Sequence, residues 1–150
     1  MLPAVSSWLK GQKLEVIPEV PLGTKRVDVI GFKKKDWWSG TRIVSVELKN
    51  DIKELERGLD QMTTFADYSH VVYLACTPAL AAEYLSRHAD AVRVTRWDPA
   101  VFKRKLDHFK IGLLLVEGEK VYLHQSPGDR EPIRDKLRHV EAVVATLDRL

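Results

Sequence analysis

The sequence predicts a single α/β domain built on a mixed β-sheet core flanked by helices, with a C-terminal β-hairpin and helix. Two alternating strand patterns precede an amphipathic helix pattern, and a continuous apolar run at 70–76 follows that helix. The 150 residues are 45% hydrophobic and 30% charged, which is typical of a folded domain. Because no low-complexity linker or internal repeat interrupts the chain, residues 1–150 are expected to form one unit.

Strands are expected where apolar and polar residues alternate with a period of two. Pro18 and Pro21 restrict the first strand to a sheet edge or an early stop, because proline donates no ladder hydrogen bond. The second strand is expected to alternate without interruption through Asp28. The expected strands are 14–17, 25–32, 42–49, 70–76, 91–95 and, as a hairpin, 111–116 with 120–125.

Helices are expected where apolar residues recur at spacings of three and four. The clearest signal begins at Asp51, an N-cap residue followed three positions later by Glu54, which can complete a capping box. Because this helix separates an alternating strand from an apolar one, a right-handed parallel crossover is expected. The expected helices are 3–11, 52–66, 78–87, 99–108 and a last one after Gly128, whose apolar stripe is Ile133, Leu137, Val140, Val144 and Leu147.

Several classes of protein lack support in this sequence. Cys76 is the single cysteine, so the chain forms no internal disulfide, which favours a reducing compartment. No apolar run reaches the ~18 residues of a membrane helix, and residues 1–11 lack the apolar core of a signal peptide. We therefore expect a cytoplasmic protein without a membrane partner. No glycine-rich nucleotide motif or Gly-x-Ser-x-Gly motif occurs, which argues against nucleotide cofactors and serine hydrolysis.

Asp28, Glu47 and Lys49 occupy strand positions where the surrounding pattern is apolar. A buried carboxylate is costly unless it is paired or binds a metal. If the second and third strands form a symmetric antiparallel hairpin that turns between Trp37 and Trp38, Asp28 lies directly opposite Glu47, with Cβ atoms ~5 Å apart. Lys49 then shares the face of Glu47, because strand side chains repeat every second residue.

This arrangement predicts a metal site. Two carboxylates so close repel each other, and a divalent cation between Asp28 and Glu47 removes the repulsion. Mg²⁺ or Mn²⁺ beside the ammonium group of Lys49 suits hydrolysis of a phosphodiester bond. An ordinary salt-bridged cluster of the same three residues is the alternative interpretation.

The order of these elements resembles the PD-(D/E)xK nuclease superfamily, and within it the small Holliday-junction-resolvase-like and DNA-repair-type members. The resemblance rests on Asp28, the segment Glu47-Leu48-Lys49, a capped helix that contains Gln61, and the apolar strand VVYLA. It covers about residues 14 to 76. It implies a restriction-endonuclease-like fold for the domain.

The resemblance also implies roles for individual residues. A metal would be bound by the carboxylates of Asp28 and Glu47 with help from the Leu48 carbonyl, and Lys49 would stand near the attacking water. Gln61 matches a helix position that some members place close to the site. Without the resemblance, Gln61 is an exposed polar residue.

Two features depart from the family pattern. Val27 stands where the family name asks for proline. Several members add an acid from the first helix as a further metal ligand, whereas residues 1–12 contain no Asp or Glu. Glu15 or Glu19 is the candidate substitute from the first strand.

A basic and aromatic loop is expected between the second and third strands. Lysine ammonium groups neutralise phosphates, and indole rings stack on unpaired bases. The alternative is a solubilising lysine run with one tryptophan packed on the core. The expected nucleic-acid-binding residues are Lys33, Lys34, Lys35, Trp37, Trp38 and Arg42.

We therefore expect a metal-dependent endonuclease that hydrolyses DNA phosphodiester bonds in branched, single-stranded or repair-intermediate DNA. A catalytically inactive nucleic-acid-binding or regulatory module on the same fold, and an RNase, are the alternatives. The apolar stripe of the last helix can serve the core or a two-fold partner. Because cutting two strands benefits from two sites, a homodimer is expected.

Overall fold

The computed structural model describes residues 1–34, 41–90 and 99–148. Its elements in chain order are α1 (Leu2–Gly11), β1 (Glu15–Leu22), β2 (Lys25–Lys34), β3 (Thr41–Leu48), α2 (Ile52–Ala66), β4 (Val71–Cys76), α3 (Pro78–Asp90), α4 (Pro99–His108), β5 (Ile111–Glu117), β6 (Lys120–Gln125) and α5 (Arg134–Asp148). The six strands form one mixed sheet in the order β1-β2-β3-β4-β5-β6. The β3–β4 and β4–β5 pairs are parallel and the other pairs are antiparallel.

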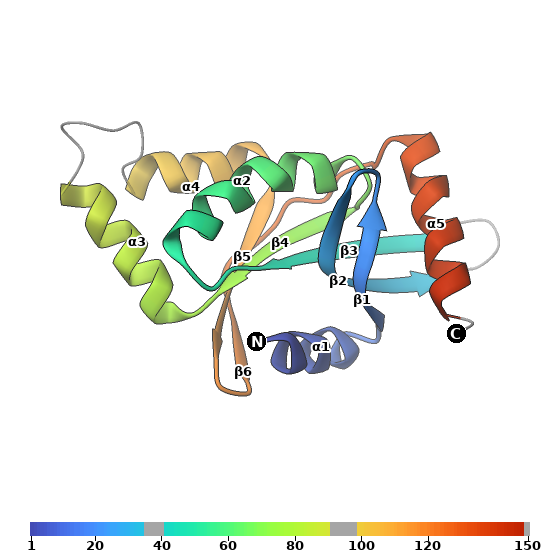
Figure 1. The fold of residues 1–150 in the computed structure, drawn as a ribbon, viewed down its shortest axis with the longest axis horizontal. Coiled ribbons are helices and arrows are strands. Elements are labelled where there is room, and N and C mark those ends of the chain that lie inside the picture. The colour runs from blue at the N-terminus through green and yellow to red at the C-terminus, as the bar shows by residue number, and fades with distance from the viewer. Residues whose placement is uncertain (35–40, 91–98, 149–150) are drawn as a thin grey trace.

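Helices cover both faces of this sheet. In the view of Figure 1, α2 and α4 lie above the sheet and α1 lies below it. The larger buried cluster contains side chains from α2, α3, α4 and α5. The smaller cluster contains Ala4, Val5 and Leu9 of α1. The structure is therefore α/β, as the sequence predicts, with a mixed sheet between two helical layers.

The β3–α2–β4 unit confirms the expected parallel crossover. At the start of α2, Asp51 Oδ1 accepts a hydrogen bond from the Glu54 N–H at 2.8 Å. Glu54 reaches back to the N–H of Asn50 at 3.1 Å, one residue before the N-cap that a capping box would use. β4 is buried along its whole length because helices cover both faces of the sheet there. The two hydrogen bonds made by Asp51 and Glu54 fix the short segment between β3 and α2.

The register of the β2–β3 hairpin is the predicted one. Val29 pairs with Val46, and Lys34 pairs with Thr41. The pairing ends at Val29 and Val46, one residue before Asp28 and Glu47, and these two meet through the hydrogen bond from the Asp28 N–H to Glu47 Oε1. β2 extends to Lys34, so Lys33 and Lys34, which were expected in the loop, belong to a strand. Residues 35–40, where the turn was expected, lie outside the described residues.

β1 continues through both of its prolines. Of the two expected outcomes, an edge position or an early stop, the structure shows the edge position. An edge strand needs ladder hydrogen bonds on one side only, so proline residues can occupy it.

The alternation of β2 is interrupted at Asp28, which corrects the expected regular strand. The β1–β2 pairing skips Glu19 and Asp28, and Glu19 has a positive φ of 54°. Val27 and Ile30 both pack into the larger cluster, whereas Val29 packs into the smaller one. In a strand with regular alternation, Val27 and Val29 would point to the same face of the sheet and pack into the same cluster. The shift of phase therefore takes Asp28 out of the regular face pattern.

The C-terminal elements follow the prediction where they are described. The β5–β6 hairpin and α4 are confirmed, and the expected strand at 91–95 lies outside the described residues. Val140 and Val144 of α5 are buried in the larger cluster, while Ile133 precedes the helix and is 50% exposed. The stripe thus packs within the chain, and the expected homodimer draws no support from it. None of the helices in the described ranges is long and apolar enough to cross a membrane.

Candidate active site

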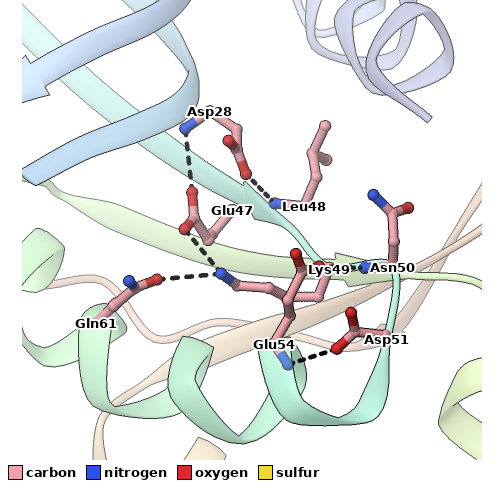
Figure 2. A network of polar contacts seen from close by, with 8 residues as sticks. All are labelled: Asp28, Glu47, Leu48, Lys49, Asn50, Asp51, Glu54 and Gln61. Atoms are coloured by element: carbon pink, nitrogen blue, oxygen red, sulfur yellow. Dashed lines mark hydrogen bonds and ion pairs between the residues drawn. The ribbon is translucent and has the colours of Figure 1, made fainter.

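Asp28, Glu47 and Lys49 meet at the carboxyl end of β3, beside α2 (Figure 2). Asp28 comes from β2, Glu47 from β3, and Lys49 follows β3 directly. Lys49 Nζ lies 3.2 Å from Glu47 Oε2. Glu47 and Lys49 are only 4% and 8% exposed. The three residues that the sequence singles out therefore form one cluster.

The two acids are held by backbone groups of each other's strands. Glu47 Oε1 accepts a hydrogen bond from the N–H of Asp28 at 3.1 Å. Asp28 Oδ2 accepts one from the N–H of Leu48 at 2.7 Å. Leu48 thus contributes its N–H to the cluster, whereas the expected ligand is its carbonyl oxygen, which stays a prediction.

The electrostatics of the site centre on Glu47. The pKa of its carboxyl is raised from 4.5 to about 7: burial contributes most, the hydrogen bonding and charge of Asp28 act in the same direction, and Lys49 opposes them. Near neutral pH, the ionised form of Glu47 therefore lacks enough positive charge around it. A divalent cation would supply that charge.

Gln61 of α2 completes the surroundings of the lysine. Its Oε1 accepts a hydrogen bond from Lys49 Nζ at 3.1 Å. Figure 2 shows the ammonium group between Glu47 on the strand and Gln61 on the helix. The position of Gln61 close to Glu47 and Lys49 is thus as expected.

Gly58 is a residue of the site that the sequence interpretation missed. A Cβ atom built on Gly58 would lie 2.8 Å from Cε of Lys49 and 3.4 Å from its Cγ. The available signal was a glycine in the interior of an amphipathic helix, where it is unfavourable unless packing requires it.

The residues of this cluster fit a hard divalent cation. Mg²⁺ commonly binds one or two carboxylates and keeps several waters, which matches the pair Asp28 and Glu47. Across the described parts of the chain, no group of three or more His, Cys, Asp and Glu could hold a metal ion. The two candidate further ligands, Glu15 and Glu19, are both exposed; Glu15 pairs with Phe32, and the β1–β2 pairing skips Glu19.

The basic segment lies away from this cluster as far as it is described. Lys33 is exposed and stands five residues along β2 from Asp28, a distance of about 17 Å at the strand rise. Arg42 pairs with Asp129, with Nη2 and Oδ1 2.7 Å apart. Lys35, Trp37 and Trp38 lie outside the described residues. The structure therefore separates Lys33 and Arg42 from the acidic pair.

Comparisons with known proteins bear on the fold. No protein-family model matches the sequence, and no curated protein matches it. Among solved structures, the chain is similar to SPO1766, a protein of unknown function from Silicibacter pomeroyi, with a TM-score of 0.68 and 15% identity. The match covers 99% of this chain and 83% of that chain. A likeness at this identity shows the α/β fold and carries no information about the reaction.

Proposed function

We propose that this chain is a metal-dependent endonuclease of the PD-(D/E)xK type, with a restriction-endonuclease-like fold, that hydrolyses DNA phosphodiester bonds. The observation that supports this is the cluster in which the half-buried Asp28 and the buried Glu47, from adjacent strands, stand beside the buried ammonium group of Lys49. Burying a glutamate and a lysine beside a second, half-buried acid is costly for a merely structural purpose. Buried charged groups of this unfavourable kind are common in active sites.

Each residue has a chemical role in this proposal. Asp28 and Glu47 are the ligands of Mg²⁺ or Mn²⁺, with the Leu48 carbonyl as a further oxygen. The cation would supply Lewis acidity for the phosphate and the attacking water. Lys49 orients that water and balances the charge that develops on the phosphate. Gln61 holds Lys49 through the hydrogen bond to Nζ.

The proposed substrate is branched, single-stranded or repair-intermediate DNA. The basic and aromatic segment binds DNA at a distance from the cut, because Lys33 stands about 17 Å along β2 from Asp28. The phosphates there are neutralised by the lysines, and the tryptophans stack on unpaired bases. The segment comprises Lys33, Lys34, Lys35, Trp37, Trp38 and Arg42. A homodimer in the cytoplasm, cutting two strands, is part of this proposal.

The experiment is a cleavage assay with Mg²⁺ or Mn²⁺ on branched, nicked, single-stranded and duplex DNA and on RNA. Glu47→Gln keeps the size of the side chain and removes its charge, so cleavage should fall at least 100-fold. Gly11→Ala is a control, because nothing lies within 4 Å of a Cβ there. Cleavage of RNA alone would make the chain an RNase. No cleavage of any substrate, or equal activity in Glu47→Gln, overturns the proposal.

A second candidate is a catalytically inactive module that binds nucleic acid. It is favoured by one observation: Lys49 already pairs with Glu47, so the cluster is partly charge-balanced without a metal. This candidate predicts DNA binding that ignores divalent cations and survives Lys49→Met. Fluorescence anisotropy with labelled DNA, with and without Ca²⁺, separates the two. Binding that strengthens with Ca²⁺ in the wild type, and loses that gain in Asp28→Asn, favours the nuclease.

A further inference from the structure

Gly58 occupies the interior of α2 on the side that faces the sheet. Glycine is the least favourable helix residue apart from proline, because it has the most backbone freedom to lose. α2 runs from Ile52 to Ala66, so Gly58 is neither a cap nor an end residue. Its φ lies outside the left-handed region, so the backbone conformation does not require glycine. The reason for a glycine must therefore lie in what packs against it.

The neighbour of Gly58 is the stem of Lys49. A Cβ atom on Gly58 would stand 2.8 Å from Lys49 Cε, closer than real Cβ contacts come. The same atom would be 3.5 Å from Cδ1 of Leu74, an ordinary contact with a fully buried side chain. Because 3.5 Å is an ordinary van der Waals distance, Leu74 would keep its position, and an added methyl group would displace the lysine side chain.

The displaced part of Lys49 is the part that positions its charge. Cε carries the ammonium nitrogen, which reaches Glu47 at 3.2 Å and Gln61 at 3.1 Å. Gln61 lies three residues beyond Gly58, so the two share one face of α2. The methylene stem of Lys49 passes over α2 at Gly58. Gln61, one helical turn further along, holds the ammonium group.

We propose that Gly58 is a positioning residue, whose missing side chain keeps open the space that Lys49 needs to stand between Glu47 and Gln61. The role of Lys49 in hydrolysis rests on the proposed function, but the space at Gly58 does not. Gly58→Ala keeps every polar group of the site and shifts only the end of the lysine side chain. The substitution should therefore improve the helix and impair the site.

A thermal double-mutant cycle tests the space directly. In a Lys49→Ala background, Gly58→Ala should raise the melting temperature by roughly 2–4 °C, because alanine is the better helix residue. In the wild-type background this gain should be reduced or reversed. Gly11→Ala adds a Cβ atom with nothing within 4 Å, so it should change the melting temperature equally in both backgrounds. Equal effects of Gly58→Ala in both backgrounds overturn the proposal.

A spectroscopic readout supports the cycle if Lys49→Ala fails to fold. The ¹³Cε resonance of Lys49 should shift in Gly58→Ala and stay in place in Gly11→Ala. An unchanged resonance in Gly58→Ala overturns the proposal.

A cleavage assay tests whether the position of the Lys49 side chain affects the reaction. Activity should fall at least 10-fold in Gly58→Ala, and the double variant should be no less active than Lys49→Ala alone. A further loss in the double variant overturns an action through Lys49. If the wild type cleaves nothing, the proposed function fails, and the melting temperatures and the resonance still decide the role of Gly58.

Discussion

Asp28 and Glu47 are joined through the backbones of two neighbouring strands. Glu47 Oε1 accepts the N–H of Asp28 at 3.1 Å, and Asp28 Oδ2 accepts the N–H of Leu48, the residue after Glu47, at 2.7 Å. The register of the β2–β3 hairpin therefore decides whether the two acids meet. A slip of one residue would move Glu47 to the opposite face of the sheet.

The free energy of unfolding should depend on pH through the ionisation of the Glu47 carboxyl. Its pKa is raised from 4.5 to about 7, first by burial and then by Asp28. The protonated form is favoured in the fold, so this contribution is complete below pH 4.5 and is lost as the pH rises through about 7. Urea unfolding without metal at pH 5 and pH 8 should show a loss of roughly 2–3 kcal/mol in the wild type that Glu47→Gln lacks. Parallel losses in the two proteins would contradict this.

Asp28→Asn should lower the pKa of Glu47. The amide keeps an oxygen that can accept the Leu48 N–H, and it removes the negative charge that raises the Glu47 pKa. A ¹³C titration of the Glu47 carboxyl in both proteins measures the change. Glu15→Gln serves as the control, because Glu15 is exposed and pairs with Phe32, well along the sheet from Asp28. A Glu47 pKa that stays or rises in Asp28→Asn would refute the assigned cause.

Lys49→Met should separate cation binding from hydrolysis. Removing the ammonium group beside Glu47 takes away a positive charge that repels a divalent cation. Because Lys49 also lowers the pKa of Glu47, calorimetry is done at an alkaline pH where Glu47 is ionised in both proteins, and Ca²⁺ should then bind several-fold more tightly to the variant than to the wild type. Cleavage with Mg²⁺ should fall about 100-fold or more, since a charge-stabilising group is lost. Weaker Ca²⁺ binding in the variant would count against a cation at this position.

Lys33→Ala should weaken DNA binding without slowing the cut. Lys33 is exposed and stands about 17 Å along β2 from Asp28, so it can contact a phosphate and not the reacting one. The slope of log affinity against log salt concentration should fall by about one. The rate at saturating DNA should be unchanged. Lys120→Ala, an exposed lysine at the β5–β6 turn, is the matched control, and an equal effect there would remove the special role of Lys33.

The sequence was sufficient for the parts of the fold that depend on periodicity. The β2–β3 register followed from two alternating strands of similar length around one turn, and the parallel crossover followed from the capped helix after Asp51. Both depend on patterns that repeat over many residues. The meeting of Glu47 with Lys49 then follows from strand spacing, whereas the place of Gln61 beside Lys49 was expected only from the family resemblance.

Local irregularities and distant contacts were beyond the sequence. Glu19 adopts a positive φ without being glycine, so nothing in its residue type announces the phase shift at Asp28. Arg42 pairs with Asp129, 87 residues away, a contact that no short-range pattern encodes. The basic segment and the acids lie on one hairpin, but Lys33 lies toward the opposite end of β2 from Asp28.

The decisive measurement for a metal between Asp28 and Glu47 is a crystal structure with Mn²⁺ at pH 8, in which anomalous scattering locates the metal. An anomalous peak is expected within coordination distance of carboxylate oxygens of both Asp28 and Glu47, with the Lys49 ammonium group displaced from Glu47 Oε2 and still bonded to Gln61. The contradicting result is a saturating Mn²⁺ soak with no peak between the two acids and the Lys49–Glu47 ion pair intact.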